Sequence, residues 1–275
     1  MRVRPTAVAG RFYPADPRAL ADLVDTLLGE VRAERSPARP VAVIAPHAGY
    51  QYSGGVAALS YAPLARWRSD IARVVLLGPA HFAPLEGMAV PGVDAFVTPL
   101  DPVEIDDDAR TVALANPAVA VDDSAHSGEH SLETQLPFLQ RALGRAVPVM
   151  PVLVGRTAPE TVAGVLSTLG AAAGSVIVVS TDLSHYLPDK RAREHDARTA
   201  AAILGRDPSA VGPDDACGHW PVRGLLQHAV DRDLDIDLLG LATSADAGAD
   251  PGRVVGYGAF LLHDAAEADR RAAGQ

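Results

Sequence analysis

The fold is indicated by the stretch Val41-Ala-Val-Ile-Ala-Pro-His47, a short apolar run that ends on a histidine. The pattern recurs at Val74 to Leu77, followed by Gly-Pro-Ala-His81, and at Val176 to Val179, followed by Ser-Thr-Asp-Leu-Ser-His185. Short continuous β-branched runs are typical of parallel strands that are buried on both faces. Ligands bind at the carboxyl ends of such strands, so we expect the three imidazoles to meet at one sheet edge.

Amphipathic segments lie between these runs. Asp16 is placed to cap a helix that begins at Pro17, and the helix that follows His47 is expected to return the chain to a neighbouring parallel strand. We therefore expect His47 and His81 on adjacent strand ends. Further helices are expected at 56–65, 160–169, 190–204 and 221–230, and further strands at 147–154, 235–242 and 254–262.

The middle of the chain is less regular. Prolines and glycines break the segment from Met88 to Ile105, which favours a local hairpin or a strand at the sheet edge. Residues 124–128 are expected to form a loop, and a helix is expected from Glu129, with Pro137 either kinking it or lying in its first turn.

These elements predict one α/β domain over residues 1–275, with a mostly parallel central sheet flanked by helices. The core is expected to span about 5–263, with a frayed tail at 264–275.

Composition narrows the class of protein. The net charge is −10, and the densest basic stretch, Lys190 to Arg193, is short and flanked by acids, so we expect no nucleic-acid partner. No apolar run approaches the roughly 18 residues of a membrane span, and the N-terminus has no apolar signal region. We expect a cytoplasmic protein without membrane contact. A single cysteine agrees with a reducing compartment.

That cysteine, Cys217, comes just before a helical stretch, where the helix dipole favours a thiolate. Together with His47 and His81 it would form a metal site of two imidazoles and one thiolate, which suits iron, copper or zinc. The alternative is satisfied structural histidines and a packing cysteine. His219 is a weaker candidate ligand, two residues from Cys217.

Six motifs occur in order: Gly10-Arg-Phe-Tyr-Pro-Ala-Asp-Pro17, Pro46-His-Ala-Gly-Tyr50, Gly78-Pro-Ala-His81, Glu129-His-Ser-Leu-Glu133, Ser180-Thr-Asp-Leu-Ser-His-Tyr186 and Ala216-Cys-Gly218. With these motifs the chain resembles the Memo family from about residue 5 to 262. The resemblance implies a fold similar to the catalytic subunit of class III extradiol ring-cleaving dioxygenases, which are non-haem iron(II) enzymes.

The resemblance also implies roles. His47 and His81 look like the histidine ligands, and Cys217 lies where the dioxygenases have a carboxylate ligand. His185 resembles their acid/base histidine, with Asp182 lining the same pocket. The resemblance to the dioxygenases makes iron(II) the first expectation. A thiolate is softer than a carboxylate, which gives copper(I) or zinc as alternatives. Ala80 stands where the family has a polar residue, which removes an expected hydrogen bond near His81.

Other polar residues are candidates for the pocket. His130 and Glu133 are three residues apart on the expected helix, so they could face together, His130 serving in catalysis and Glu133 in substrate binding, or they could form a helix-start cap. Tyr50 and Tyr186 could line a substrate pocket, or be buried with satisfied hydroxyls.

The leading functional hypothesis is oxygen-dependent redox chemistry, active or vestigial, on a small molecule. The alternatives are a zinc hydrolase, in which Asp182 or His185 acts as base, and a non-catalytic module that binds a peptide or protein.

Overall fold

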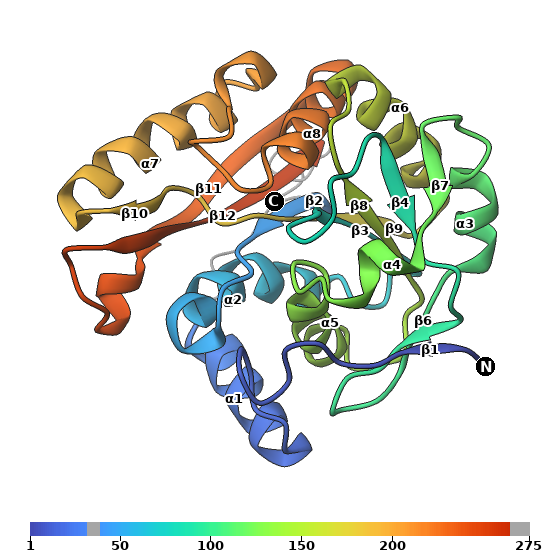
Figure 1. Cartoon of the computed structure of the whole chain (residues 1–275), viewed down its shortest axis with the longest axis horizontal. Coiled ribbons are helices and arrows are strands. Elements are labelled where there is room, and N and C mark those ends of the chain that lie inside the picture. Colours follow the sequence, from blue (N-terminus) through green and yellow to red (C-terminus); the bar gives the residue numbers. More distant parts are fainter. Residues whose placement is uncertain (32–38, 265–275) are drawn as a thin grey trace, which may run out of the picture.

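Four parallel strands form the centre of the main sheet in the computed structural model, which describes residues 1–31 and 39–264 (Figure 1). Their spatial order is β2 (Pro40–Ala45), β9 (Ser175–Ser180), β3 (Arg73–Pro79) and β8 (Val149–Val154). Alternate residues of β2 enter different cores: Val43 packs on one side of the sheet and Ile44 on the other. The predicted runs are therefore parallel strands buried on both faces.

One expectation about their order is wrong. β2 and β3 are not neighbours, because β9 pairs in parallel with both and lies between them. The position beside β2 is thus taken by β9, which begins about a hundred residues after the end of β3 in the sequence. As a result, the segment after β9, which includes Asp182, emerges between the segments that carry His47 and His81.

Further strands extend the sheet on both sides. On one side β12 (Val254–Asp264) pairs antiparallel with β2, and β11 (Leu234–Thr243) and β10 (His185–Leu187) pair antiparallel with β12. On the other side β4 (Met88–Val90) pairs antiparallel with β8, and β7 (Val119–Val121) pairs in parallel with β4. A small second sheet joins β1 (Val3–Arg4), β5 (Ala95–Phe96) and β6 (Val103–Glu104), and the antiparallel β5–β6 pair is the expected hairpin. The last strand ends at Asp264, so the tail expected after it lies outside the described residues.

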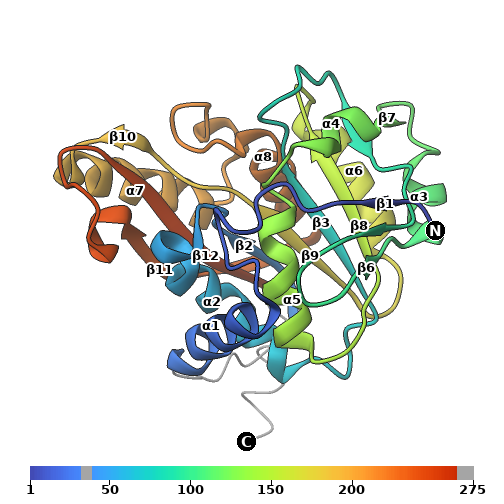
Figure 2. The same cartoon turned by 60° about the horizontal axis from the view of Figure 1, so that its bottom comes forward.

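Helices cover both faces of the sheet, which gives three layers (Figure 2). One face carries α1 (Pro17–Glu30), α2 (Tyr50–Arg66) and α5 (Leu136–Leu143). The other carries α3 (Asp107–Ala113), α6 (Pro159–Gly170) and α8 (His219–Arg232), while α7 (Asp189–Leu204) packs on β11 and β12. The side chain of Asp16 caps α1 by accepting a hydrogen bond from the amide of Ala19 at 2.8 Å, as expected.

Three local expectations need correction. Residues 124–128 lie mostly in a short helix, α4 (Asp123–Ser127), because the Asp122 side chain caps it. The helix expected from Glu129 begins later, with a 3-10 turn at Glu133–Gln135 that leads into α5, and Pro137 lies in the first turn of α5. The second helix starts at Tyr50, well before residue 56. Further 3-10 turns lie at Pro208–Ala210 and Ser244–Ala247.

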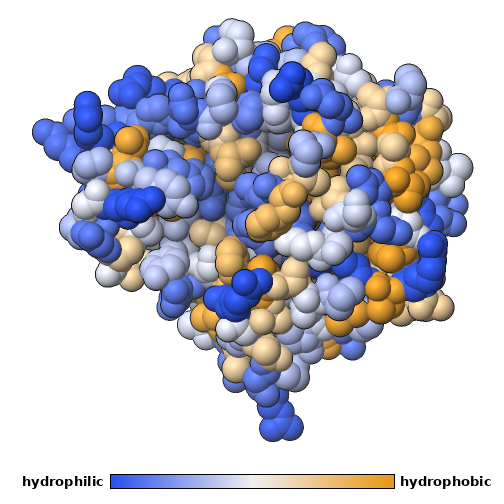
Figure 3. Space-filling model, in the orientation of Figure 1, coloured by the Kyte–Doolittle hydropathy of each residue, from blue (hydrophilic) through white to orange (hydrophobic). Residues whose placement is uncertain are grey.

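The surface in Figure 3 is largely hydrophilic, with scattered apolar patches. Within residues 1–31 and 39–264, no helix combines the length and apolar character needed to span a bilayer.

Candidate metal centre

Three donor residues from distant segments meet at the carboxyl end of the central strands. His47 follows β2, His81 follows β3, and Cys217 precedes α8. Their ligand atoms all lie within 4.8 Å of one another, and His47 Nε2 is 3.3 Å from Cys217 Sγ. We call these three residues the metal cluster. The structure thus brings together the three ligands expected from the sequence.

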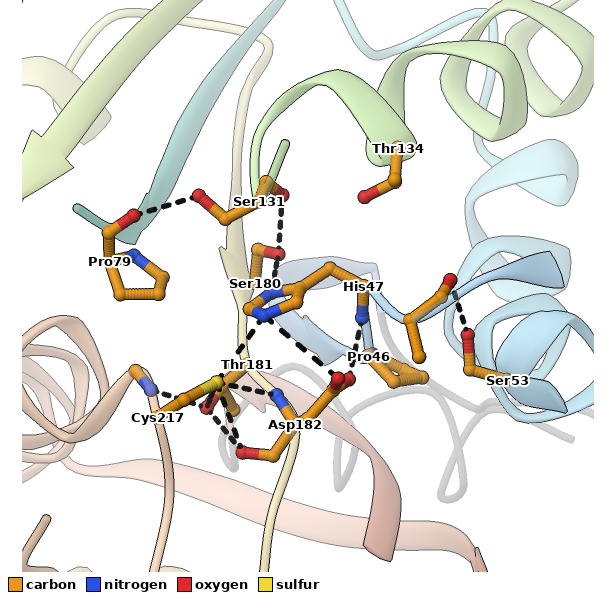
Figure 4. Close-up of polar contacts among 12 residues, drawn as sticks. Pro46, His47, Ser53, Pro79, Ser131, Thr134, Ser180, Thr181, Asp182 and Cys217 are labelled. Carbon is orange, nitrogen blue, oxygen red and sulfur yellow. Dashed lines mark hydrogen bonds and ion pairs between the residues drawn. The ribbon is translucent and has the colours of Figure 1, made fainter. Parts of the chain in front are cut away.

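His47 is buried, and hydrogen-bond partners hold both its backbone and its ring (Figure 4). Its backbone amide donates to Asp182 Oδ1 at 2.8 Å, and its Nδ1 lies 2.8 Å from Ser180 Oγ. Burial, helped by the nearby imidazoles of His81, His130 and His185, lowers the pKa of His47 well below its ordinary value. The ring is therefore neutral at pH 7, the form that binds metals.

His81 is oriented by the carboxylate of Glu129. Glu129 Oε1 lies 2.9 Å from His81 Nδ1, and Oε2 accepts from the His81 amide at 2.6 Å. Burial of Glu129 opposes ionisation, but hydrogen bonds from His81 and from the amide of Ser131 outweigh it and lower its pKa to about 2. The ionised carboxylate can only accept, so Nδ1 of His81 donates to it, and Nε2 is the ring nitrogen that remains for a metal ion. Glu129 thus supplies a polar partner that Ala80 cannot.

Gly78 and Gly218 allow the backbone approaches that build the centre. A Cβ at Gly78 would lie 2.8 Å from Ser131 Oγ, and one at Gly218 would lie 2.7 Å from Thr181 Cβ. The Gly218 amide also donates to Thr181 Oγ1 at 2.9 Å, which ties the segment of Cys217 to the end of β9. Larger residues would push the ligand-bearing segments apart.

Cys217 Sγ accepts a hydrogen bond from the Asp182 amide at 3.3 Å. Burial and the negative charge of Asp182 raise the pKa of Cys217 to about 12. The expectation that the helix dipole alone favours a thiolate is therefore wrong for the metal-free protein. A cation beside Sγ would reverse the balance, since coordinating thiols are deprotonated by the metal charge.

Asp182 lies beside the metal cluster, and His185 lies toward solvent. Asp182 Oδ2 is 4.0 Å from His47 Nε2, and burial raises the pKa of Asp182 to about 6. The His185 side chain is exposed, with Nδ1 2.8 Å from the Leu183 carbonyl.

The third imidazole packed against the metal cluster is that of His130. Its ring stacks on that of His81 with centroids 4.8 Å apart and meets that of His47 edge-on at 5.5 Å, whereas the described ring contact of His185 is with Tyr186. Burial lowers the pKa of His130 to about 4, so the ring is neutral at pH 7. His130 thus joins His47 and His81 in direct ring contact, while His185 lies near enough to lower the pKa of His47 without a described ring contact to it.

Comparisons with known proteins identify the family of this chain. A family described as Memo-like protein matches residues 4–261. The chain belongs to the Memo-like family. A MEMO1 family protein of Aquifex aeolicus is 42% identical over 207 residues, covering 74% of this chain and 75% of the relative. MEMO1 family proteins of Methanopyrus kandleri and Ignicoccus hospitalis are 34% and 36% identical, each covering 94% of this chain and 98% of the relative.

Glu133 has a separate environment in this Memo-like chain. Its buried carboxylate pairs with Arg4 at 2.6 Å and accepts from Tyr13 Oη at 2.6 Å and from the amides of Ala7 and Val8. We call Arg4, Tyr13 and Glu133 the N-terminal clamp. His130 and Glu133 do not share a helix face, because the α-helix begins only after both of them.

The two tyrosines expected at the pocket lie in different surroundings. Tyr50 is buried, and its hydroxyl donates to the Thr134 carbonyl at 2.5 Å. Tyr186 is 61% exposed, and the Arg253 guanidinium lies 4.2 Å from its ring centroid. His219 packs on Trp220, and the metal-competent groups found among the described residues do not include it.

Two residues that support the ligands were missed by sequence reasoning. Glu129 and Ser180 stand inside the family motifs but received no role, although each contacts a ligand imidazole. Ser180 had a signal, because it is the first polar residue after the apolar run of β9. Glu129 had a weaker one, as a carboxylate adjacent to a histidine.

Proposed function

We propose that this Memo-like protein binds a transition-metal ion through His47, His81 and Cys217 and uses it in an oxygen-dependent reaction on a small organic molecule. The observation that supports this most is the convergence of three donor atoms within 4.8 Å. Histidines and cysteines that serve only packing seldom place their nitrogen and sulfur atoms around one point. Metal-binding histidines typically also use their second ring nitrogen in a hydrogen bond, as His47 does with Ser180 and His81 with Glu129.

The oxygen-dependent chemistry of the proposal calls for a redox-active ion, and the donor set accommodates iron(II) or copper(I) in that role. Calcium and magnesium need clustered oxygen ligands, but Glu129 is engaged by His81 and Asp182 Oδ1 by the His47 amide. Two imidazoles with one thiolate suit iron, copper or zinc. Three protein ligands leave coordination positions open for small molecules, and a bound iron(II) ion would supply redox chemistry toward dioxygen.

The surrounding residues of this chain would move protons. Asp182, with a pKa of about 6, can accept and return a proton near neutral pH. His185 is suited to exchange protons with solvent at the rim, because its Nδ1 faces the Leu183 carbonyl and its Nε2 is left as the acceptor.

The aromatic side chains beside His130 favour an organic substrate over a bare inorganic ion. Phe82 is 69% exposed, and its ring centroid lies 5.7 Å from that of His130. Phe12 meets His130 edge-on at 4.9 Å from another side. An exposed aromatic ring beside a donor cluster is well placed to bury apolar surface of a ligand.

The test is metal binding by protein purified without oxygen, with iron(II), copper(I) and zinc offered in turn to the wild type and to Cys217→Ser. We expect tight iron or copper binding that the substitution abolishes. Oxygen uptake by the iron form with candidate small molecules then tests turnover, and the redox-silent zinc form is the control.

Other outcomes would replace the proposal. Tight binding of zinc alone would favour a hydrolase with Asp182 or His185 as base. Failure of the wild type to bind any of the three metals would favour a pocket that receives a peptide or protein without catalysis.

A further inference from the structure

The amide of Gln135 has only one orientation that satisfies its neighbours. Its Nε2 lies 2.9 Å from the Pro46 carbonyl, which can only accept, and its Oε1 accepts from Tyr61 Oη at 2.5 Å. Exchange of the amide nitrogen and oxygen would set two acceptors against each other at Pro46. The NH2 group of Gln135 therefore also points at Ser180 Oγ, 3.0 Å away.

This orientation determines how the hydroxyl of Ser180 is used. A serine hydroxyl has one proton to donate and two lone pairs. The proton goes to the Ser131 carbonyl at 2.6 Å, because a carbonyl cannot donate, and one lone pair accepts from Gln135. One lone pair remains, and the only other described partner is His47 Nδ1, at 2.8 Å.

From this we infer that Ser180 is a positioning residue that sets the tautomer of His47, with the proton on Nδ1 and a free lone pair on Nε2. With the other tautomer, two lone pairs would meet at 2.8 Å in a site from which water is excluded, since Ser180 is 0% exposed. The Ser131 carbonyl and the Gln135 amide fix the orientation of the Ser180 hydroxyl, and that hydroxyl in turn fixes which nitrogen of His47 carries the proton.

The sulfur of Cys217 agrees with this assignment. Sγ lies 3.3 Å from His47 Nε2 and accepts from the Asp182 amide on another side. A protonated thiol can donate to Nε2 only if that nitrogen carries no proton. The tautomer therefore offers Nε2 to the thiol in the metal-free protein and to the ion in the loaded protein, and this last consequence rests on the proposed function.

The test is the tautomer of His47 in metal-free protein, read from long-range ¹H–¹⁵N correlations of histidine-labelled samples and assigned with His47→Gln. We expect the Nδ1–H form in the wild type and an increase of the Nε2–H form in Ser180→Ala. Iron(II) affinity should fall about 10- to 100-fold in that variant. Ser180→Thr, which keeps a hydroxyl, should restore the wild-type tautomer.

Ser60→Ala is the matched control. Ser60 is also fully buried and donates to the carbonyl of a central strand, that of Ile44, but it contacts no imidazole. It should lose similar stability while both the tautomer and the metal affinity stay unchanged. An equal fall in affinity for the two serine variants would reduce Ser180 to a packing role and overturn the inference.

The wild-type spectrum decides the matter even if Ser180→Ala does not fold, because an Nε2–H form of His47 in the wild type contradicts the inference directly. The test also separates the two proposals. An Nδ1–H tautomer in a wild-type protein that binds no metal would leave the tautomer assignment standing and remove the proposed function.

Discussion

The metal cluster and the N-terminal clamp use two buried glutamates that are four residues apart, Glu129 and Glu133, in opposite ways. In the clamp, Glu133 receives four donors, from Arg4, Tyr13 and two backbone amides, within the described residues. Beside the metal cluster, Glu129 also accepts four hydrogen bonds, from His81 Nδ1 and from the amides of His81, His130 and Ser131, but the imidazole that it holds belongs to a group of converging ligand atoms. Glu133 is therefore part of a polar network that needs no further partner, whereas Glu129 orients a residue of a cluster that could still bind an ion.

The difference teaches how a structural polar network is distinguished from a functional one. Buried polar groups are normally paired, so a saturated network needs no ligand to explain it. Ligand atoms that converge with fewer protons than lone pairs leave some lone pairs unpaired unless something binds between them. The clamp meets the first description and the metal cluster the second, and the following substitutions test that division.

Glu133→Gln should have the largest effect and should break the clamp alone. The change leaves the Arg4 guanidinium buried without its counter-charge, which costs about 3–5 kcal/mol of unfolding free energy. Urea denaturation of the metal-free protein measures this loss. Iron(II) affinity of the folded fraction should be close to that of the wild type, and a parallel collapse of metal binding would show that the two networks are not separate.

His81→Ala should break the metal cluster alone. A structural zinc site is worth about 10–16 kcal/mol over four ligands, so the loss of one ligand costs roughly 3–4 kcal/mol, or a few hundred-fold in affinity. The substitution also takes the imidazole partner from the buried Glu129 carboxylate, which keeps its backbone amide donors, so the unfolding free energy of the metal-free protein should fall by about 1–3 kcal/mol. Stoichiometric metal in the purified variant would refute the ligand assignment.

Glu129→Gln repeats the chemistry of Glu133→Gln four residues earlier and should give a smaller, different result. The amide NH2 would face either the His81 amide or the several donors at Oε1, so the His81 ring loses its orientation. We expect iron(II) binding to weaken about 10- to 100-fold. Isothermal titration of the two glutamine variants side by side provides the comparison, and equal affinities would remove the distinction.

The pH dependence of metal binding sharpens the same contrast. Because burial and Asp182 raise the pKa of Cys217 to about 12, the thiol must lose its proton when metal binds. Affinity should therefore rise with pH, about tenfold per unit between pH 7 and 9, with release of one proton. Titrations in buffers of different ionisation enthalpy measure that proton, and an affinity independent of pH would mean that Cys217 is not a ligand.

Arg141→Ala should have the smallest effect. Arg141 pairs with Asp25 across α5 and α1, but both side chains are substantially exposed, so the pair is worth about 0–1 kcal/mol. Thermal unfolding and metal affinity should both remain near the wild-type values. A loss comparable to that of Glu133→Gln would show that exposure is a poor guide to which ion pairs matter in this fold.

Local pattern predicted the elements well. The central strands and the helices after Asp16, Glu160 and Lys190 were located closely, because apolar periodicity and capping residues act over a few neighbouring positions. The apolar runs that end on histidines, together with the single cysteine, suggested the three ligands before the family motifs supported them, and the structure brings these residues together.

The order of the strands in the sheet and the positions of the His130 and His185 rings could not be predicted from local sequence pattern. The run that becomes β9 looks like the other two, and nothing local shows that it inserts between β2 and β3. For the same reason His185 and His130 could not be ranked. The chain turns after Asp182 into an exposed strand, while the loop from Glu129 folds back over His81, and both outcomes depend on contacts with distant segments.

The 170 residues between His47 and Cys217 have a consequence for how the protein is made. A nascent chain displays both histidines long before the cysteine leaves the ribosome, so the full set of donors exists only near the end of synthesis. If the proposed metal binds there, the ion would link the first half of the protein to the last, and at a thousand times its dissociation constant it would add about 4 kcal/mol to the free energy of opening. Release of the ion would remove this link between the end of β2 and the start of α8, and a fragment ending before Cys217 could not form the link.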